Sequence, residues 1–268
     1  CIPSKTLLHI AKVLEEAESL KKMGVTFTKP TIDIDLVRDW KNKVVSQLSG
    51  GIGQMAKARR VKTIQAEATF LSDNEVQLKS ESSTEKLTFD HCIVASGSSS
   101  TIIPGIPFDN ENVLTSKTAL DLKKIPKSLL VIGGGYIGLE MGTVFSALGS
   151  SVSLAEFLPN LLPGADPDLV KPLARKLKKE FSEIHLSTKI TKVEQAKSGV
   201  MDVTMEKNGE ETTKQYEQVL VSVGRKPNTE KMGVDKTNIK VNEQGFISVD
   251  KHQQTSVKNI FAIGDIVG

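Results

Sequence analysis

The sequence predicts an α/β fold in which helices cover a central parallel β-sheet. Two observations in one stretch support this prediction. An apolar run at residues 129–132 leads directly into a glycine-rich turn, GGGYIG, at residues 133–138. A segment of helix length follows, and a second apolar run then ends at Glu156. A strand, a helix and a second strand in this order form a βαβ unit, and such units place their two strands parallel.

The glycine-rich turn has the spacing of a dinucleotide-binding motif. We expect Gly133 to allow the tight turn, Gly135 to let the backbone approach a diphosphate, and Gly138 to let the helix pack closely on the sheet. The diphosphate would then meet unpaired N–H groups at the positive end of the helix. A glycine turn alone would be a weak sign, but here the strands, the helix and the acidic end all have the right spacing.

Glu156 predicts which dinucleotide is bound. It lies 18 residues beyond Gly138 (156 minus 138), at the end of the second predicted strand. A carboxylate at this place can accept hydrogen bonds from both hydroxyls of the adenosine ribose, and it would repel a 2′-phosphate. The sequence therefore predicts NAD rather than NADP.

The length and composition limit the classes of protein to which the chain can belong. A chain of 268 residues can bury a large core and is expected to form two domains. Its 35 basic and 32 acidic residues give a net charge of +3, and the basic run at residues 57–62 is interpreted as a solvated helix end. No apolar run approaches the roughly 18 residues of a membrane helix. We therefore expect a soluble, intracellular protein that binds neither nucleic acid nor membranes, and two cysteines argue against a disulfide-stapled secreted one.

Two helices are predicted in the N-terminal region. Apolar residues recur at helical spacing over residues 7–20, and Gly24 supplies a stop. A second helix is expected to open near Asp33, to be broken at residues 50–51 (Gly-Gly), and to resume to about Arg60.

A further helix is predicted after Pro167, beyond the βαβ unit. Pro172 lies inside this helix and is expected to bend it. The apolar positions placed on its buried face are Leu169, Val170, Leu173, Leu177 and Phe181.

The remaining segments predict β-strands, which cover residues 61–71, 75–79, 87–95, 189–193, 200–206, 219–223 and 260–263. The strand at 87–95 is expected to be a single buried one. Asn208–Gly209 is typical of a type I′ turn, so the strands on either side of it are expected to form a hairpin. Residues 100–128 contain three prolines and no sustained periodicity, which favours a crossing between domains.

Three predicted strands end in small or acidic residues, at Ala95–Gly97, Ser222–Gly224 and Ile263–Asp265. Ligands of open α/β sheets bind at the carboxyl ends of strands. Asp265 could therefore accept a hydrogen bond from a polyol or ribose hydroxyl. The residues alone favour the simpler alternative, an Asx turn that closes the strand.

Five motifs occur in one order across the chain: CIPSK, ASGS, VIGGGYIGLE, SVGRKPNT and IFAIGDIVG. Together they resemble the flavin-dependent disulfide oxidoreductases, and most closely the dihydrolipoyl dehydrogenases, the E3 components of 2-oxo acid dehydrogenase complexes. The segment at residues 40–62 is similar to the bacterial enzymes. The resemblance covers essentially all 268 residues. It implies FAD/NAD(P)-binding Rossmann-like domains, with a central parallel sheet, helices and a three-stranded antiparallel β-meander.

The resemblance implies a flavin site. Cys1 would be the second cysteine of the redox pair, the one nearer the flavin. Lys5 would lie beside the isoalloxazine ring, paired with Glu140. The other implied FAD residues are Ala68 at the adenine, Ser96 and Gly97 at a strand end, and Asp265 at the ribityl chain, which reverses the preference for a plain turn.

The resemblance also implies an NAD site and a division by cofactor. Residues 1–117 would belong to an FAD-binding domain, 118–246 to an NAD-binding domain, and 247–268 to a return strand of the first. Tyr136 is either a lid over the nicotinamide pocket or an aromatic residue that packs on the sheet, and both readings stay open. The implied NAD residues are Gly133, Gly134, Gly135, Tyr136, Ile137, Gly138, Glu156, Ile190 and Gly224.

The activity implied is oxidation of protein-bound dihydrolipoamide through a redox disulfide and FAD, with hydride passed to NAD⁺. The implied partner is the lipoyl domain of an E2 acyltransferase. The resemblance further implies a homodimer in the bacterial cytoplasm.

The sequence departs from this family at both ends. It begins at Cys1 without the family's first cysteine or its N-terminal FAD motif, and it ends at Gly268 before the dimerisation domain with its His-Glu pair. We therefore expect an internal segment that cannot complete the reaction alone. Cys92 lies in an apolar strand and is expected to be a buried, inert thiol.

Two alternatives remain at this point. One is another flavin disulfide reductase, although a glutathione reductase would call for cationic residues where Glu156 stands, and the distinguishing cysteines of mercuric reductase lie outside these residues. The other is a non-catalytic nucleotide-binding module.

Overall fold

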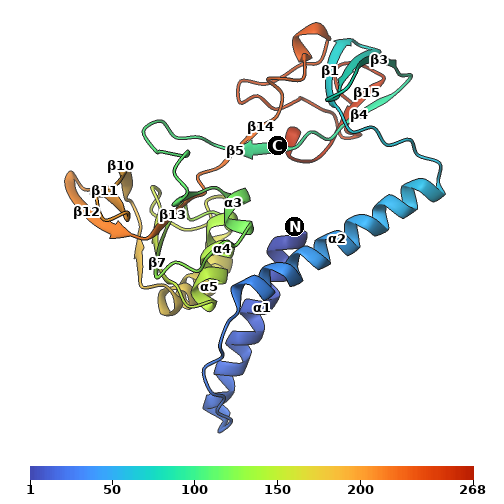
Figure 1. The fold of residues 1–268 in the computed structure, drawn as a ribbon. Helices are drawn as coiled ribbons and strands as arrows, with labels where there is room; N and C mark the ends of the chain where they lie inside the picture. The colour runs from blue at the N-terminus through green and yellow to red at the C-terminus, as the bar shows by residue number, and fades with distance from the viewer. The chain divides into compact units, whose positions relative to one another are not determined.

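The computed structural model describes all 268 residues, which group into two compact units. The first unit comprises residues 1–54 and 102–224, and the second comprises residues 55–101 and 225–268. Figure 1 shows both along the chain, coloured from the N-terminus to the C-terminus. The division by cofactor that the sequence suggests remains a prediction.

A five-stranded parallel sheet forms the centre of the first unit, which confirms the predicted α/β fold. Its strands lie in the order β6-β13-β7-β8-β9, and every neighbouring pair is parallel. β7 is central and almost entirely buried, as expected of a parallel strand covered on both faces. The strands are β6 (Val113–Leu114), β7 (Ser128–Ile132), β8 (Ser151–Ala155), β9 (Glu183–His185) and β13 (Gln218–Val221).

The two faces of this sheet carry different layers, because side chains alternate along a strand. Leu129 and Val131 pack into a cluster with residues of α4, whereas Leu130 and Ile132 pack into a second cluster with the β-meander. Figure 1 shows α4 on one side of β7 and the meander on the other. The helices are α3 (Ser116–Leu120), α4 (Tyr136–Ala147) and α5 (Pro167–Glu180).

The β-meander consists of β10 (Lys189–Gln195), β11 (Met201–Lys207) and β12 (Glu210–Tyr216), which pair antiparallel in this order. Asn208 and Gly209 between β11 and β12 have φ values of 55° and 83°. Two successive positive φ angles define a type I′ turn, so both the turn and the meander are confirmed.

Two N-terminal helices, α1 (Ile2–Ser19) and α2 (Ile34–Ala58), belong to the first unit, except for residues 55–58 at the end of α2, which belong to the second. A short 3₁₀ turn, η1 (Leu20–Met23), extends α1 to Gly24, which ends it with a φ of 89° as predicted. Leu7 of α1 is buried in the same cluster as α4.

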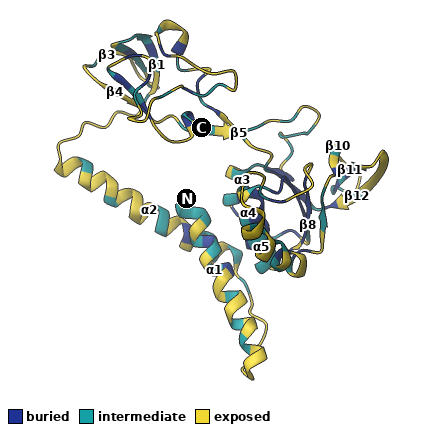
Figure 2. Ribbon diagram, turned by 180° about the vertical axis from the view of Figure 1, so that it is seen from behind, coloured by how far each residue is buried: buried dark blue, intermediate teal, exposed yellow.

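The predicted break at Gly50–Gly51 is wrong, because α2 runs through it without interruption. A glycine inside a helix costs about 1 kcal/mol relative to alanine, which is less than the loss of the helical hydrogen bonds on either side. Figure 2 shows α2 as largely exposed. Neither α2 nor any other helix combines the length and the apolar character needed to span a membrane.

α5 confirms the predicted helix after Pro167 and continues through Pro172. One of its predicted core residues is wrong: Leu169 is 71% exposed. Leu177 is fully buried, and Val170 is partly buried in the same cluster. Leu169 is rotated by about 100° from Val170 around the helix, so the buried face begins at Val170.

The second unit contains small sheets. β1 (Glu67–Ser72), β2 (Glu75–Lys79) and β3 (Thr84–Thr88) form an antiparallel sheet. β4 (Cys92–Val94) and β15 (Ile260–Ala262) pair parallel, and β5 (Ser98–Ser100) pairs antiparallel with β14 (Arg225–Pro227). Two 3₁₀ turns, η2 (Val234–Lys236) and η3 (Gly264–Ile266), complete it.

The single buried strand predicted at residues 87–95 is wrong. The segment forms the end of β3 and all of β4, in different sheets. The N–H of Phe89 donates to the carbonyl of Asn74, which closes the hairpin, and the polar pair Asp90–His91 then leads the chain away. Leu87 is consequently 44% exposed.

The packing of α4 on α5 can be tested at Gly142. A Cβ at this position would lie 2.7 Å from Cζ of Phe181, which is itself buried. Gly142→Ala should therefore destabilise the full-length protein by about 1–3 kcal/mol, the usual cost of overpacking a filled core. Urea unfolding followed by circular dichroism measures this change.

Gly51→Ala is the matched control, because it changes a helical glycine whose added Cβ would have no atom within 4 Å. It should leave stability unchanged or raise it by up to about 1 kcal/mol. Equal stability of the two variants would contradict the close contact between α4 and α5.

Candidate functional site

A cavity of about 870 Å³ lies at the carboxyl ends of β7, β8 and β13, within the first unit. Its volume falls in the range of about 300–1,000 Å³ that is typical of ligand pockets. We call it the nucleotide cavity. Six of the predicted NAD residues line it: Gly133, Gly135, Tyr136, Glu156, Ile190 and Gly224.

The other three predicted residues, Gly134, Ile137 and Gly138, do not line the nucleotide cavity. Close packing of the backbone requires glycine at two positions of the turn, Gly133 and Gly138. A Cβ on Gly133, whose φ is 104°, would lie 2.4 Å from the carbonyl oxygen of Ser222. A Cβ on Gly138 would lie 2.2 Å from the carbonyl oxygen of Gly133. The first turn of α4 therefore lies directly against the ends of β7 and β13.

Gly135 is required for a different reason. It is the N-cap residue of α4, and an added Cβ would meet no protein atom within 4 Å. Protein packing therefore does not explain the glycine, whereas a ligand that approaches the backbone closely would. This is the arrangement expected where a diphosphate contacts the helix end.

The N-terminus of α4 offers free hydrogen-bond donors. No side chain caps this helix, and the N–H groups of Gly135, Tyr136 and Ile137 have no acceptor in the protein. By contrast, Gly133 donates to the carbonyl of Ala155 at 2.8 Å. Free donors at the positive end of a helix bind anions, so this edge of the nucleotide cavity fits a diphosphate.

Glu156 carries a buried carboxylate that also lines the nucleotide cavity, with only 7% of the residue exposed. Its Oε2 accepts from the N–H of Gly134 at 2.6 Å, and its Oε1 accepts from the N–H of Leu158 at 2.7 Å. Each carboxylate oxygen has further lone pairs, so both can still accept from ribose hydroxyls. The negative charge at this place also fits the exclusion of a 2′-phosphate.

Tyr136 is 63% exposed and lines the nucleotide cavity, so it does not pack on the sheet. The alternative in which it is a core aromatic is therefore wrong, and its role as a lid stays a prediction.

Two parts of the nucleotide cavity were missed by the sequence reasoning. One is the loop at residues 157–165, which directly follows Glu156 and contributes Phe157 and Leu158. Its position after a strand that ends at a ligand site was the available signal. The other is the role of Ser222, which the sequence placed only at a strand end: its hydroxyl donates to the carbonyl of Ile132 at 3.0 Å and so fixes β13 to the glycine turn.

Lys5 and Glu140 form the predicted ion pair, with Nζ 2.5 Å from Oε1. The pair connects the first turn of α1 with the second turn of α4, although the two residues lie 135 positions apart in sequence. Cys1 is the exposed N-cap residue of α1, one turn before Lys5. The structure therefore brings Lys5 and Glu140 together and places Cys1 on the same helix end.

The second unit contains the other predicted flavin residues. β4 and β15 are parallel neighbours, so Ser96 and Gly97 follow one strand while Asp265 follows the other. Oδ2 of Asp265 accepts from the hydroxyl of Ser98 at 2.7 Å. Because its carboxylate bonds to a distant side chain rather than to its own backbone, the alternative of a plain Asx turn is wrong. Ala68 lies on β1, paired with Leu78.

Sequence reasoning also missed the residues around Asp265. Nε of Arg225 donates to Ser98 Oγ at 2.6 Å and lies 3.5 Å from Asp265 Oδ2. Asn228 donates from Nδ2 to the carbonyl of Ser96 at 2.9 Å. Arg225 and Asn228 both belong to the SVGRKPNT motif, which was the available signal.

Cys92 is partly buried rather than fully buried. Burial raises the pKa of its thiol, so the protonated form is favoured. This agrees with an unreactive thiol.

Comparisons with known proteins agree with these structural observations. The chain is 45% identical to a dihydrolipoyl dehydrogenase of Vibrio cholerae and 44% identical to one of Haemophilus influenzae, each over 100% of this chain and 56% of the relative. The chain therefore spans about half the length of these relatives. Its structure is similar to the Cu(II) complex of the HOCl-induced flavoprotein disulfide reductase RclA from Escherichia coli, with a TM-score of 0.83 and 26% identity, over 100% of this chain and 56% of that one.

The family model described as pyridine nucleotide-disulphide oxidoreductase matches residues 1–268, the whole of this chain. The match agrees with the parallel sheet, the glycine turn and the acidic residue at the end of the second strand. The chain belongs to the pyridine nucleotide-disulphide oxidoreductase family.

Proposed function

We propose that this chain supplies the NAD site and part of the FAD site of a dihydrolipoyl dehydrogenase. The observation that carries the proposal is the carboxylate of Glu156. It is buried at the edge of the nucleotide cavity, with one oxygen bound to the N–H of Gly134 and the other to that of Leu158. The similarity to bacterial dihydrolipoyl dehydrogenases supports the choice of substrate.

The NAD site is proposed to be the nucleotide cavity. The free N–H groups of Gly135 and Tyr136 would bind the diphosphate, and Glu156 would accept from the adenosine ribose. Tyr136 would cover the nicotinamide end, while Ile190 and Gly224 would line the walls. The fixed position of the Glu156 carboxylate favours NAD over NADP, which argues against a glutathione reductase.

Each unit contains residues that are proposed to bind flavin. Asp265, oriented by Ser98, would accept from the hydroxyls of the ribityl chain, and Ser96 and Gly97 would lie at the neighbouring strand end. Lys5 would lie beside the ring, and Glu140 would fix its ammonium group. Bound FAD would supply two-electron redox chemistry between a dithiol and a nicotinamide.

Cys1 is proposed to be one of the two redox thiols. It lies at the positive end of α1, and helix N-termini stabilise thiolates. In the overall reaction the two thiols of dihydrolipoamide are oxidised to a disulfide. Two electrons and one proton reach NAD⁺ as a hydride, and the second proton is released.

The proposed partner is the lipoyl domain of an E2 acyltransferase, which would present the dihydrolipoamide. We further propose a homodimer in the bacterial cytoplasm. The Vibrio and Haemophilus relatives, both bacterial dihydrolipoyl dehydrogenases, support these proposals.

Glu156→Arg in the full-length protein should shift the preference from NADH towards NADPH. The variant loses a carboxylate that would bind both ribose hydroxyls and gains a charge that attracts a 2′-phosphate. Because hydrogen bonds to charged groups contribute about 1.5–3 kcal/mol, kcat/KM for NAD⁺ should fall about 10- to 100-fold. Steady-state kinetics with both dinucleotides measures the ratio.

Glu156→Gln serves as the control, because its amide oxygen can still accept from Gly134 or Leu158 without the negative charge. It should weaken NAD⁺ use less than Glu156→Arg does. Unchanged selectivity in Glu156→Arg would reject the ribose assignment.

Cys1→Ser in the full-length protein should abolish turnover of dihydrolipoamide, because serine cannot form the redox disulfide. Electron transfer from NADH to an artificial acceptor should persist, since that reaction needs no thiol. Spectrophotometric assays of both reactions separate the two steps.

Cys92→Ser is the matched control and should keep both reactions, because Cys92 is a partly buried thiol in β4. If Cys1→Ser turned over dihydrolipoamide at the full rate, Cys1 would have no place in the mechanism.

A further inference from the structure

A second cavity, of about 460 Å³, lies in the first unit between α5, β9 and the loop at residues 157–165. None of the predicted site residues lines it. Its walls are mainly apolar and include Leu158, Leu161, Leu162, Val170, Ala174 and Ile184. We call it the outer cavity.

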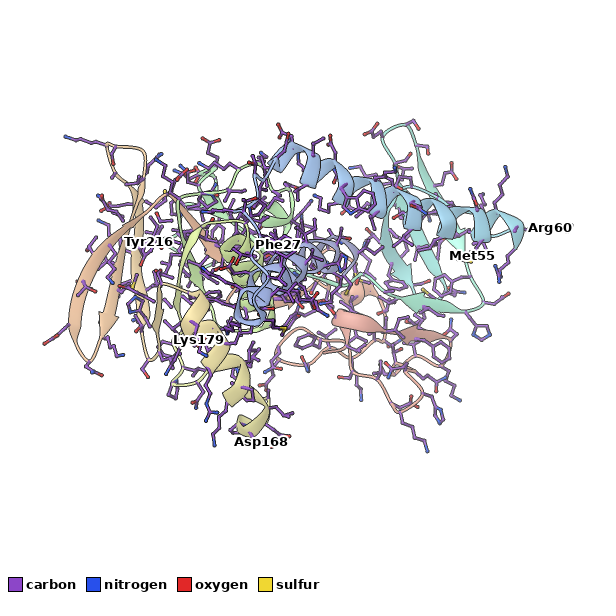
Figure 3. All side chains as sticks on the ribbon, turned by 90° about the horizontal axis from the view of Figure 1, so that it is seen from below. Phe27, Met55, Arg60, Asp168, Lys179 and Tyr216 are labelled. Carbon is purple, nitrogen blue, oxygen red and sulfur yellow. The ribbon has the colours of Figure 1, made fainter.

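The charged side chains that line the outer cavity are all positive. Lys171 and Lys178 are the only charged side chains that line it, and both are exposed on α5. They are seven residues apart, which is two helical turns, so they lie on the same face. Figure 3 shows the side chains of α5, with Asp168 labelled near its start and Lys179 near its end.

These two lysines have no acidic partner, although a neighbour on the same helix does. Lys176 pairs with Glu15 at 2.6 Å and with Glu180 at 3.5 Å, whereas neither Lys171 nor Lys178 takes part in an ion pair. An apolar chamber with unpaired cations at its rim matches a ligand with an apolar tail and an anionic head.

We propose that the outer cavity binds a small amphipathic anion, a carboxylate with a medium-length aliphatic chain, and that this ligand weakens NAD binding. The aliphatic chain would occupy the space between Val170 and Leu161. The carboxylate would remain at the rim, within reach of Lys171 and Lys178.

Binding in the outer cavity is coupled to NAD binding because the two cavities share a wall. Leu158, Leu162 and Gly164 line both the outer cavity and the nucleotide cavity. The N–H of Leu158 donates to Glu156, and the N–H of Leu162 donates to the carbonyl of Gly134 at 2.9 Å. The loop that closes the outer cavity therefore also holds the carboxylate and the glycine turn in position.

This loop contains a strained residue. Leu162 has a φ of 49°, a left-handed conformation that a residue with a Cβ rarely adopts. A ligand that pushes the loop away from α5 would relieve this strain and separate the N–H groups of Leu158 and Leu162 from their acceptors. The expected direction is thus weaker dinucleotide binding. Only this coupling rests on the proposed NAD site; binding in the outer cavity does not.

Binding is tested by calorimetric titration of the full-length protein with octanoate. Octanoate should bind, while acetate, which has no tail, and 1-octanol, which has no charge, should bind at least about fivefold more weakly. Absence of octanoate binding, or equal binding of acetate, would overturn the proposal.

The location is tested with the double variant Lys171→Gln/Lys178→Gln, which should bind octanoate about three- to tenfold more weakly. Lys179→Gln is the matched control, since Lys179 is an exposed residue of α5 that does not line the outer cavity. It should bind octanoate as the unchanged protein does. Equal affinity in the double variant would place octanoate elsewhere.

The coupling is tested by following NADH binding through its fluorescence, with and without saturating octanoate. The dissociation constant of NADH should rise about fivefold. Octanoate that binds without changing this constant would reject the coupling. A protein that binds octanoate but not NADH would reject the proposed function while the outer-cavity site stands.

Discussion

The nucleotide cavity depends on how closely the first turn of α4 approaches the ends of β7 and β13. Neither Gly133 nor Gly138 could carry a Cβ without a collision with backbone atoms. The hydroxyl of Ser222 adds hydrogen bonds to the carbonyls of Ile132 and Gly133 across the same contact. Because the helix is held against the sheet, its free N–H groups have a fixed position relative to the strand that ends at Glu156.

Because α4 is fixed against the sheet, the nucleotide cavity presents a positive charge at one place and a negative charge at another. The N-terminus of α4 presents the positive end of a helix dipole, and Glu156 presents a buried negative charge beyond the next strand. A dinucleotide carries its own charges in a matching order, with a diphosphate between two riboses. Under the proposed function, the cavity would recognise both the chemistry and the direction of such a ligand, and a short motif together with one acid 18 residues beyond it would define the site.

Local patterns in the sequence were sufficient for features that depend on neighbouring residues. Asn208–Gly209 predicted a turn, Gly24 predicted the end of a helix, and the apolar run at residues 129–132 predicted a buried strand. Local patterns failed where a remote partner decides the outcome. Residues 87–95 looked like one strand, but β3 pairs with β2 whereas β4 pairs with β15, near the other end of the chain.

The same distinction applies to the candidate sites. The glycine turn and Glu156 were readable because a βαβ unit imposes their spacing. The bond from Ser98 to Asp265 joins residues 167 positions apart, and no pattern within either segment contains it. The wall formed by residues 157–165 has no regular period, so its apolar residues could not be assigned to a cavity. Family resemblance recovered Lys5 and Glu140, which periodicity alone would have left as unrelated helix residues.

The ion pairs of α1 also bear on the order in which the chain can fold. Lys5 pairs with Glu140, and Glu15 with Lys176, over sequence separations of 135 and 161 residues. At about 5–20 residues per second, a ribosome needs roughly 6–30 s to supply the partners of α1 after the helix itself has been made. During synthesis the helix that carries Cys1 must therefore wait with Leu7 and Ala11 uncovered, and it can dock only after α4 has formed on the parallel sheet.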